Sequence, residues 1–319
     1  MTIRAWRSSA LGTTGATACA LAFTPALAAD ELFIPEAEPV ADGVYAIIGP
    51  TDARTYENHG MNANYGIVET DEGVLLIDSG PTAFSAELIE EAVAEVTDTP
   101  IRWVLNIGVQ DHRWLGNDYF QREHDAEVIA FEETARQQEA FASDHLEGRL
   151  KEAVGDRLEG TEPAYADREL EGEESTLELG GVTFELQRTD AHFPGDAMAH
   201  LPEADVVFTG DLVYVDRMLG VHPWSSVENG YEAYQELADL GPETVVPGHG
   251  QVSDMERVER DTGAYYEFLV HEVGAAAEDL EPLDEVVERH REESAFQHLE
   301  HFDGWHTTNI NRAYLEFEW

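Results

Sequence analysis

Three side chains of the types that bind zinc follow short apolar segments of the chain. His192, Asp211 and His249 come after residues that read as β-strands. Strands that end at the same edge of a sheet would bring these side chains together. Imidazole nitrogens and carboxylate oxygens are suitable zinc ligands. The sequence therefore indicates a metal site, and His112, in an earlier polar loop, is a fourth candidate ligand.

The loop that carries His112 lies within residues 103–120, which read W-V-L-N-I-G-V-Q-D-H-R-W-L-G-N-D-Y-F. An apolar run that predicts a strand ends at Asn106, and a helical pattern resumes after Gly116-Asn117. A loop between a strand and a helix is where α/β proteins often place their chemistry. Asp111 and His112 are therefore the candidate catalytic residues.

This loop resembles the metal-binding loop N-T-H-x-H-x-D-H-x-x-G-N of the metallo-β-lactamase superfamily. Asn106 and Gly116-Asn117 align with the two ends of that motif without a gap. The family's His, His, Asp and His ligands then correspond to other residues here, namely Gly108, Gln110, His112 and Arg113. The frame of the loop is present, but most of its metal ligands are replaced.

Later segments match the same superfamily in the same order. A-H-F-P-G-D (Ala191–Asp196) resembles H-T-x-G-D, and F-T-G-D-L-V-Y (Phe208–Tyr214) places Asp211 where the family has a metal-bridging aspartate. V-V-P-G-H-G (Val245–Gly250) places His249 at the last ligand, and Asp78, in L-L-I-D-S-G, corresponds to an aspartate that organises the ligand loop. The segments G-D-L-V-Y-V-D-R-M-L-G and D-T-G-A-Y-Y are similar to periplasmic zinc hydrolases of the quinoprotein-relay type.

The resemblance implies an α/β (α+β) fold, the four-layer αββα metallo-β-lactamase sandwich. In the family, the first zinc takes the first two loop histidines and the counterpart of His192. The second takes the loop Asp and His, the counterpart of His249 and the shared aspartate. Too few of these ligands remain here for two zinc ions, so the expected cofactor is one zinc ion or none.

Two arrangements of the site remain open. In the first, His112, His192, Asp211 and His249 bind one metal ion, which lowers the pKa of a bound water to about 7. In the second, the Arg113 guanidinium takes the place of the lost metal and pairs with Asp211 without any zinc. We favour the second arrangement, because an arginine does not give up its proton and would repel a cation.

The pattern of apolar residues predicts the elements around these loops. The first half has the order β-β-β-α-β, with strands at Val44–Ile48, Tyr65–Glu69 and Val74–Asp78, a helix at Ala83–Val96 and a strand at Ile101–Leu105. Residues 30–42 are expected to be a loose lead-in. Long helices are expected at three places, Glu132–Leu158, Met255–Val273 and Leu283–Phe302, and the last is followed by a helical end at Trp305–Trp319.

The first 29 residues have the features of an export signal. Arg4 and Arg7 are followed by the small and apolar stretch Ala10–Phe23 and by an A-x-A cleavage site at residues 26–28. The remaining residues, 30–319, are expected to form one domain with a helical tail. The protein is therefore expected to be periplasmic or secreted.

The charge of the chain is strongly acidic. Sixty-six acidic residues face 18 basic ones, which gives a net charge of −48, or −50 without the two arginines of the signal. Self-repulsion of this size is tolerable when salt screens it, as in a halophilic organism. Binding to nucleic acid or to an anionic membrane is not expected, which leaves a small-molecule substrate or ligand as the partner. The oligomeric state is left open.

These features predict an exported, hydrolase-like protein with at most one metal ion. One alternative is a non-catalytic pseudoenzyme that binds a ligand in the old cleft. A second alternative is a fully active zinc hydrolase of lactam, thioester or other ester bonds. One scaffold serves many substrates, so the sequence does not select among them.

Overall fold

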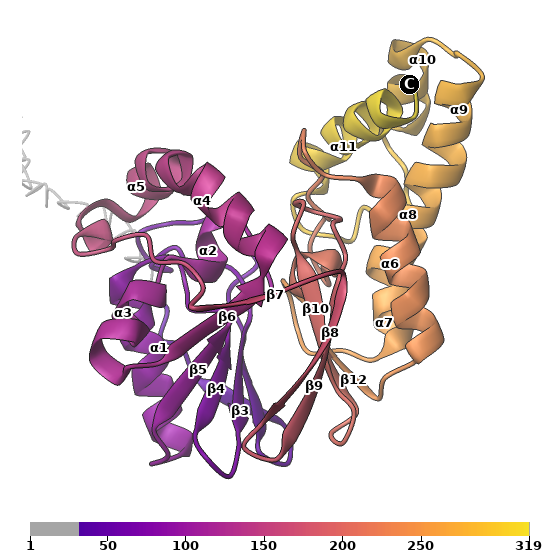
Figure 1. Cartoon of the computed structure of the whole chain (residues 1–319). Helices are drawn as coiled ribbons and strands as arrows, with labels where there is room; N and C mark the ends of the chain where they lie inside the picture. Colours follow the sequence, from indigo (N-terminus) through magenta and orange to yellow (C-terminus); the bar gives the residue numbers. More distant parts are fainter. Residues whose placement is uncertain (1–31, 319) are drawn as a thin grey trace, which may run out of the picture. The chain divides into compact units, whose positions relative to one another are not determined.

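The computed structural model describes residues 32–318, and the export signal expected at residues 1–29 lies outside them. Two β-sheets organise the described residues (Figure 1). The first sheet has the strands β1 (Ala37–Ala41), β2 (Val44–Ile47), β3 (Tyr65–Glu69), β4 (Val74–Ile77), β5 (Ile101–Leu105), β6 (Glu127–Phe131) and β7 (Arg168–Leu170), in that order. The second has the order β12 (Thr244–Val246), β11 (Val206–Phe208), β10 (Ala197–Leu201), β9 (Val182–Arg188) and β8 (Glu174–Leu179).

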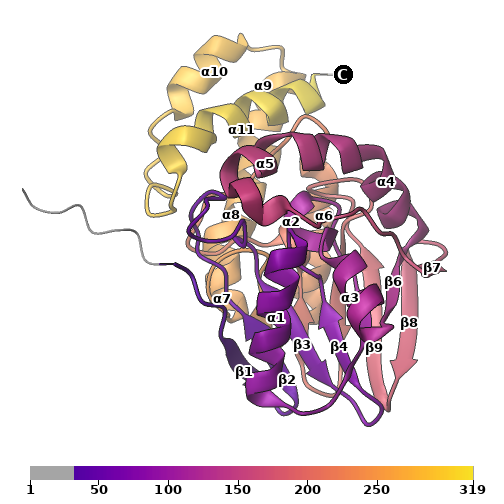
Figure 2. The same cartoon turned by 90° about the vertical axis from the view of Figure 1, so that its left-hand side faces the viewer.

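Helices cover the outer face of each sheet. On the first sheet, α1 (Ala83–Val96) and α3 (Asn117–His124) pack against strands β3 to β6, and Figure 2 shows both helices in front of this sheet. On the second sheet, α6 (Val227–Leu240) and α8 (Ala264–Phe268) belong to the largest apolar cluster. A third cluster, which includes Leu75, Leu105 and Phe184, fills the space between the sheets. This four-layer arrangement confirms the predicted αββα sandwich.

Strand β4 shows why the central strands are so apolar. All four of its residues are buried, because one face meets the helical layer and the other meets the second sheet. Strands covered on both faces read as continuous apolar runs rather than as alternating patterns. β4, β5 and β6 are parallel, so their carboxyl ends lie at one edge of the first sheet.

Two predictions about secondary structure in the first half are wrong. Part of the expected lead-in, residues 37–41, forms the edge strand β1 and pairs with β2. The single helix expected at Glu132–Leu158 is broken into α4 (Glu132–Glu147), α5 (Arg149–Val154) and a 3-10 turn (Gly155–Leu158). The break falls at Gly148, where a Cβ atom would lie 2.4 Å from the Asp144 carbonyl oxygen, so only glycine fits this turn.

The carboxyl-terminal half also differs from the prediction. Asp254 caps a continuous helical stretch from Met255 to Glu278 that comprises α7 (Met255–Val258), α8, α9 (Ala275–Glu278) and two π-helical segments, at Glu259–Gly263 and Leu269–Gly274. The helix expected at Leu283–Phe302 ends earlier, as α10 (Leu283–His290). Residues 291–301 leave the helix, because Glu300 instead pairs its backbone with Asp216 and Met218. The chain then forms α11 (Phe302–Phe317).

Between residues 32 and 318, every helix is too short or too polar to cross a bilayer.

Candidate functional site

The ends of strands from both sheets position the candidate site. His112 and Arg113 belong to the short helix α2 (Asp111–Trp114), which follows β5. Asp211 lies in a 3-10 turn after β11, and His249 follows β12. Because β11 and β12 are parallel neighbours, their carboxyl ends bring Asp211 and His249 to the same edge of the second sheet.

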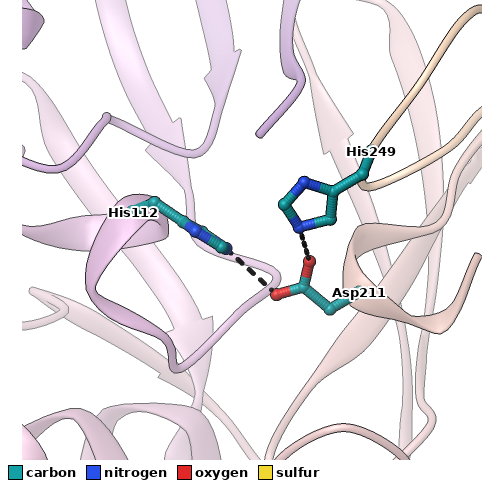
Figure 3. Close-up of side chains that lie close together, drawn as sticks. All are labelled: His112, Asp211 and His249. Carbon is teal, nitrogen blue, oxygen red and sulfur yellow. Dashed lines mark hydrogen bonds and ion pairs between the residues drawn. The ribbon is translucent and has the colours of Figure 1, made fainter. Parts of the chain in front are cut away.

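His112, Asp211 and His249 meet at one point between the sheets (Figure 3). The Nε2 atom of His112 lies 3.2 Å from Asp211 Oδ2, and Nε2 of His249 lies 3.1 Å from Asp211 Oδ1. One ligand atom from each residue lies within 4.8 Å of the others, and all three residues are buried. This group has the residue types and spacing that could bind one metal ion.

The Arg113 guanidinium also contacts the Asp211 carboxylate. Its Nη2 atom lies 2.5 Å from Asp211 Oδ1 and its Nε atom 3.3 Å from Oδ2, so the guanidinium faces both carboxylate oxygens. Nη1 donates to Asp78 Oδ2 at 3.1 Å and to the Asn64 carbonyl at 3.0 Å. With 1% of its side chain exposed, Arg113 is a buried cation held between two carboxylates.

Gly108 makes room for this arginine. A Cβ atom at position 108 would lie 2.7 Å from Cγ and 3.0 Å from Cδ of Arg113. Any side chain at position 108 would therefore collide with the Arg113 stem. The two departures from the ligand pattern of the family are linked, because the arginine fills the space left by the missing side chain.

Two further aspartates fix the loop that carries these residues. Asp78 Oδ1 accepts a hydrogen bond from the Ile107 amide, and Asp196 Oδ1 accepts one from the Val109 amide at 2.8 Å. Asp196 comes from the loop between β9 and β10, so the second sheet also holds the loop in place. The A-H-F-P-G-D segment contains Asp196, but the sequence alone did not single this residue out.

His192 lies outside the group at Asp211. Its Nδ1 atom is 2.8 Å from the Gly220 carbonyl and its Nε2 atom is 3.0 Å from the Gln110 side-chain amide. Burial lowers the pKa of His192, so the ring is neutral at pH 7. Of the four predicted metal ligands, the structure brings three together and places His192 against Gln110.

Asp111 does not contact Asp211 through its side chain. Its carboxylate pairs with Arg54, and the same guanidinium lies 2.9 Å from Nδ1 of His112. On the other side of the group, Nη1 of Arg217 lies 2.9 Å from Nδ1 of His249. Arg54 comes from a loop without a recognisable motif, and Arg217 belongs to the segment G-D-L-V-Y-V-D-R-M-L-G, but the sequence analysis assigned neither of them to the site.

His249 can adopt two tautomers in this setting. Its Nδ1 atom faces the donor on Arg217 and also lies 2.5 Å from the Asn62 carbonyl oxygen. With the proton on Nε2, the ring donates to Asp211 and accepts from Arg217. With the proton on Nδ1, it donates to Asn62 and leaves the Nε2 lone pair facing Asp211.

Opposing effects set the charges of the site. Burial alone would raise the pKa of Asp211, but Arg113 and His112 outweigh this effect and hold that pKa well below its usual value. Burial raises the pKa of Asp78 to about 7. The ion pair with Arg113, at 3.1 Å, lowers this pKa but offsets only part of the effect of burial. Burial, with help from Arg217, lowers the pKa of His249 to about 3. At neutral pH the site therefore contains an ionised Asp211, a cationic Arg113 and neutral histidines.

This arrangement does not fit the two-zinc centre of the family. Gly108 offers no ligand atom, the Gln110 amide is engaged by His192, and a guanidinium stands at Arg113. Both oxygens of Asp211, which would bridge two ions, already face that guanidinium. A second cation beside Arg113 would meet a fixed like charge that does not deprotonate.

Comparisons with known proteins agree with this fold. Residues 110–249 match the family model of the metallo-beta-lactamase superfamily. No curated protein matches the chain. The stereoselective inverting sec-alkylsulfatase Pisa1 from Pseudomonas sp. has 17% sequence identity and a TM-score of 0.69, over 89% of this chain and 50% of that one. This chain therefore spans about half the length of the sec-alkylsulfatase structures that it matches.

Two solved metallo-beta-lactamase structures give the same result. A metallo-beta-lactamase from Pontibacter korlensis has 20% identity and a TM-score of 0.58, over 73% of this chain and 99% of that one. The DIM-1 metallo-beta-lactamase has 16% identity and a TM-score of 0.55, over 74% and 99% of the two chains. Identities this low support the fold and not the activity. Residues 110–249, somewhat less than half of the chain, thus match the metallo-beta-lactamase superfamily model, and the described residues have the fold of solved metallo-beta-lactamases.

Proposed function

We propose that this protein is a metal-free member of the superfamily that binds a small molecule in the old active-site cleft. The observation that carries the proposal is the contact of the Arg113 guanidinium with both oxygens of Asp211. This pair neutralises the carboxylate that would otherwise bridge the metal ions. A carboxylate buried without a partner would be costly, so the ion pair removes the need for a metal at this point.

The surrounding contacts support an arginine that is fixed in place. Arg113 also donates to Asp78, to the Asn64 carbonyl and to the Gly248 carbonyl at 3.3 Å. A planar guanidinium with this many acceptors has little freedom to leave for an incoming ion. Since Gly108 accommodates the stem of Arg113, the local sequence is adapted to the arginine and not to a metal ligand.

A second candidate is a hydrolase with one metal ion. It is favoured by the spacing of His112, Asp211 and His249 and by the His249 tautomer that donates to Asn62. These three residues would hold one zinc ion, which in such sites lowers the pKa of bound water to about 7. In that case Asp111 and His192 would line the site without holding the ion, and Arg113 would have to turn away from Asp211.

We also propose that the protein is exported and works in a periplasmic or extracellular, salt-rich setting. The support is the amino-terminal sequence and the net charge of −48. The likeness of two motifs to quinoprotein-relay zinc hydrolases suggests that subgroup as its origin. The ligand would be a small molecule and not a nucleic acid, because a chain of this net charge repels the polyanionic backbone of a nucleic acid.

The metal dependence of folding tests the proposal directly. The melting temperature of the parent protein is measured in high salt with EDTA and with added zinc, and zinc binding is followed by calorimetry. A metal-free protein should melt at the same temperature in both solutions and take up no zinc at the site. A marked loss of stability in EDTA, restored by one equivalent of zinc, would instead favour the one-metal hydrolase.

A further inference from the structure

Arg217 is a buried cation without a carboxylate partner among residues 32–318. Only 4% of the residue is exposed, and its one hydrogen bond goes from Nη1 to the neutral ring of His249. Its Nε atom is buried and has no acceptor in the described part of the chain. In a chain with 66 acidic residues, a buried arginine that forms an ion pair with none of them in the described part of the chain is unexpected.

The nearest groups do not compensate this charge. The guanidinium carbon lies 5.9 Å from the centre of the Tyr214 ring and 5.7 Å from that of Trp305. These rings attract the cation, but neither accepts a hydrogen bond from the N–H groups of Arg217. The lost hydration of Arg217 is therefore only partly replaced by the protein.

Arg54 contacts His112 in the same way as Arg217 contacts His249. It donates to Nδ1 of His112, as Arg217 does to Nδ1 of His249, and the two imidazole rings are 5.2 Å apart between their centres. The Nε atom of Arg54 is also buried without an acceptor in the described residues. Arg54 pairs with Asp111 but keeps 17% of its side chain exposed, so it lies nearer to solvent than Arg217.

We propose that Arg217, assisted by Arg54, binds an oxyanion group of the ligand at the outer side of the His112–His249 pair. The inference deepens the proposed function, on which it rests, by naming the chemical class of the ligand. A carboxylate or sulfate group has at least two oxygens, and these can accept paired N–H bonds from one guanidinium. Such a group would supply the missing counter-charge and the missing acceptors together.

Calorimetric titration of the EDTA-treated full chain tests this inference. Sodium acetate, sodium sulfate and sodium phosphate are titrated separately, each at constant total ionic strength in sodium chloride. At least one of them should bind saturably at a single site, and the three titrations together show which oxyanion the site prefers. Saturable binding is required, because sulfate and phosphate also stabilise proteins in general by exclusion from the surface.

Variants assign the binding to the arginine. Arg217→Gln should weaken binding by about tenfold or more, since it removes a charge-assisted pair. Arg217→Lys keeps the charge but not the paired donors, so it should bind more weakly than the parent and more tightly than Arg217→Gln. Arg291→Gln is the matched control, because Arg291 forms an exposed pair with Glu288 and should bind as the parent does.

Two results would overturn the inference: no saturable binding of any of the three oxyanions, or parent-like affinity in Arg217→Gln. If Arg217→Gln does not fold, Arg54→Gln replaces it, since that side chain is less buried, and it should weaken binding by several-fold. An unchanged affinity in Arg54→Gln would then count against the site. The zinc content of the protein before EDTA treatment reports separately on the proposed function, so failure of one proposal is distinguishable from failure of the other.

Discussion

Replacing Arg113 by alanine removes the only cation in direct contact with Asp211 among residues 32–318. Asp211 is fully buried, and Arg113 contacts both of its oxygens. The substitution also removes the partner of Asp78 Oδ2 and a donor to the Asn64 carbonyl. Breaking a buried ion pair by removing one member typically costs about 3–5 kcal/mol. Arg113→Ala should therefore lower the free energy of unfolding by roughly this amount.

Zinc should recover much of that loss in the variant. Without the guanidinium, His112, Asp211 and His249 have room for an ion, and their ligand atoms already lie within 4.8 Å of one another. A ligand that binds only the folded state stabilises it by mass action, by about 2.7 kcal/mol at a hundredfold excess over its Kd. The parent should gain far less, because Arg113 blocks the position.

Urea unfolding in high salt measures both effects. The parent, Arg113→Ala and the control Arg291→Ala are compared in EDTA and in excess zinc. Arg291→Ala should behave as the parent, because exposed pairs contribute little. The reasoning is refuted if EDTA strongly weakens the parent while the stability of Arg113→Ala does not depend on zinc. That result would mean that a metal already holds the site.

Other perturbations test separate parts of the account. Gly108→Ala places a Cβ atom 2.7 Å from Arg113 Cγ and should destabilise the parent by about 1–3 kcal/mol. The same change should cost much less in an Arg113→Ala background, and additive effects in this double-mutant cycle would contradict the predicted collision. The melting temperature should rise steeply from low to multimolar KCl, because salt screens a net charge of −48, and a flat profile would exclude salt adaptation. The folded pKa of His249, about 3, lies below the unfolded value of 6.5, so its contribution to stability is complete above pH 6.5 and is lost as the pH falls toward 3, by about 1.4 kcal/mol per pH unit. Urea unfolding at several pH values in high salt should show this pH dependence of the unfolding free energy. In His249→Asn the slope should be smaller by about 1.4 kcal/mol per pH unit, which corresponds to one proton fewer taken up on unfolding. The raised pKa of Asp78 acts in the opposite sense between pH 3.8 and 7, so the variant comparison, and not the parent profile alone, decides this prediction.

The parts of the fold that were predicted correctly depend on local patterns. Helix α1 has its predicted bounds, because apolar residues at helical spacing follow a cap at Thr82. Strands β3 and β5 match as well, since each is a compact apolar run between turn residues. The αββα architecture followed from the order of the superfamily motifs, which fixes the sequence of layers without any knowledge of long-range contacts.

The errors arise where tertiary contacts override local preference. Residues 291–301 have helical composition, but the backbone of Glu300 pairs with Asp216 and Met218, which are distant in sequence. Edge strand β1 is only partly buried, so it lacks the apolar pattern that identifies central strands.

The candidate site was also predicted only in part from the sequence. The Arg113–Asp211 pair was expected because both residues lie in recognisable motifs, and the structure contains it. Arg217 shares the G-D-L-V-Y-V-D-R-M-L-G segment with Asp211, and Arg54 lies in a loop without a motif. No spacing in the sequence relates either arginine to His112 or His249, because packing sets the course of these loops. The placement of His192 against Gln110, away from Asp211, likewise depends on the path of two loops.

In the proposed function, the Arg113 guanidinium stands where the superfamily holds its metal ions. The most direct test is a crystal structure of the protein prepared without chelator and soaked in zinc, with anomalous diffraction recorded at the zinc edge. We expect no anomalous peak between His112, Asp211 and His249, and electron density for the Arg113 guanidinium against both oxygens of Asp211. Two zinc ions bridged by Asp211, with Arg113 turned away, would contradict the account.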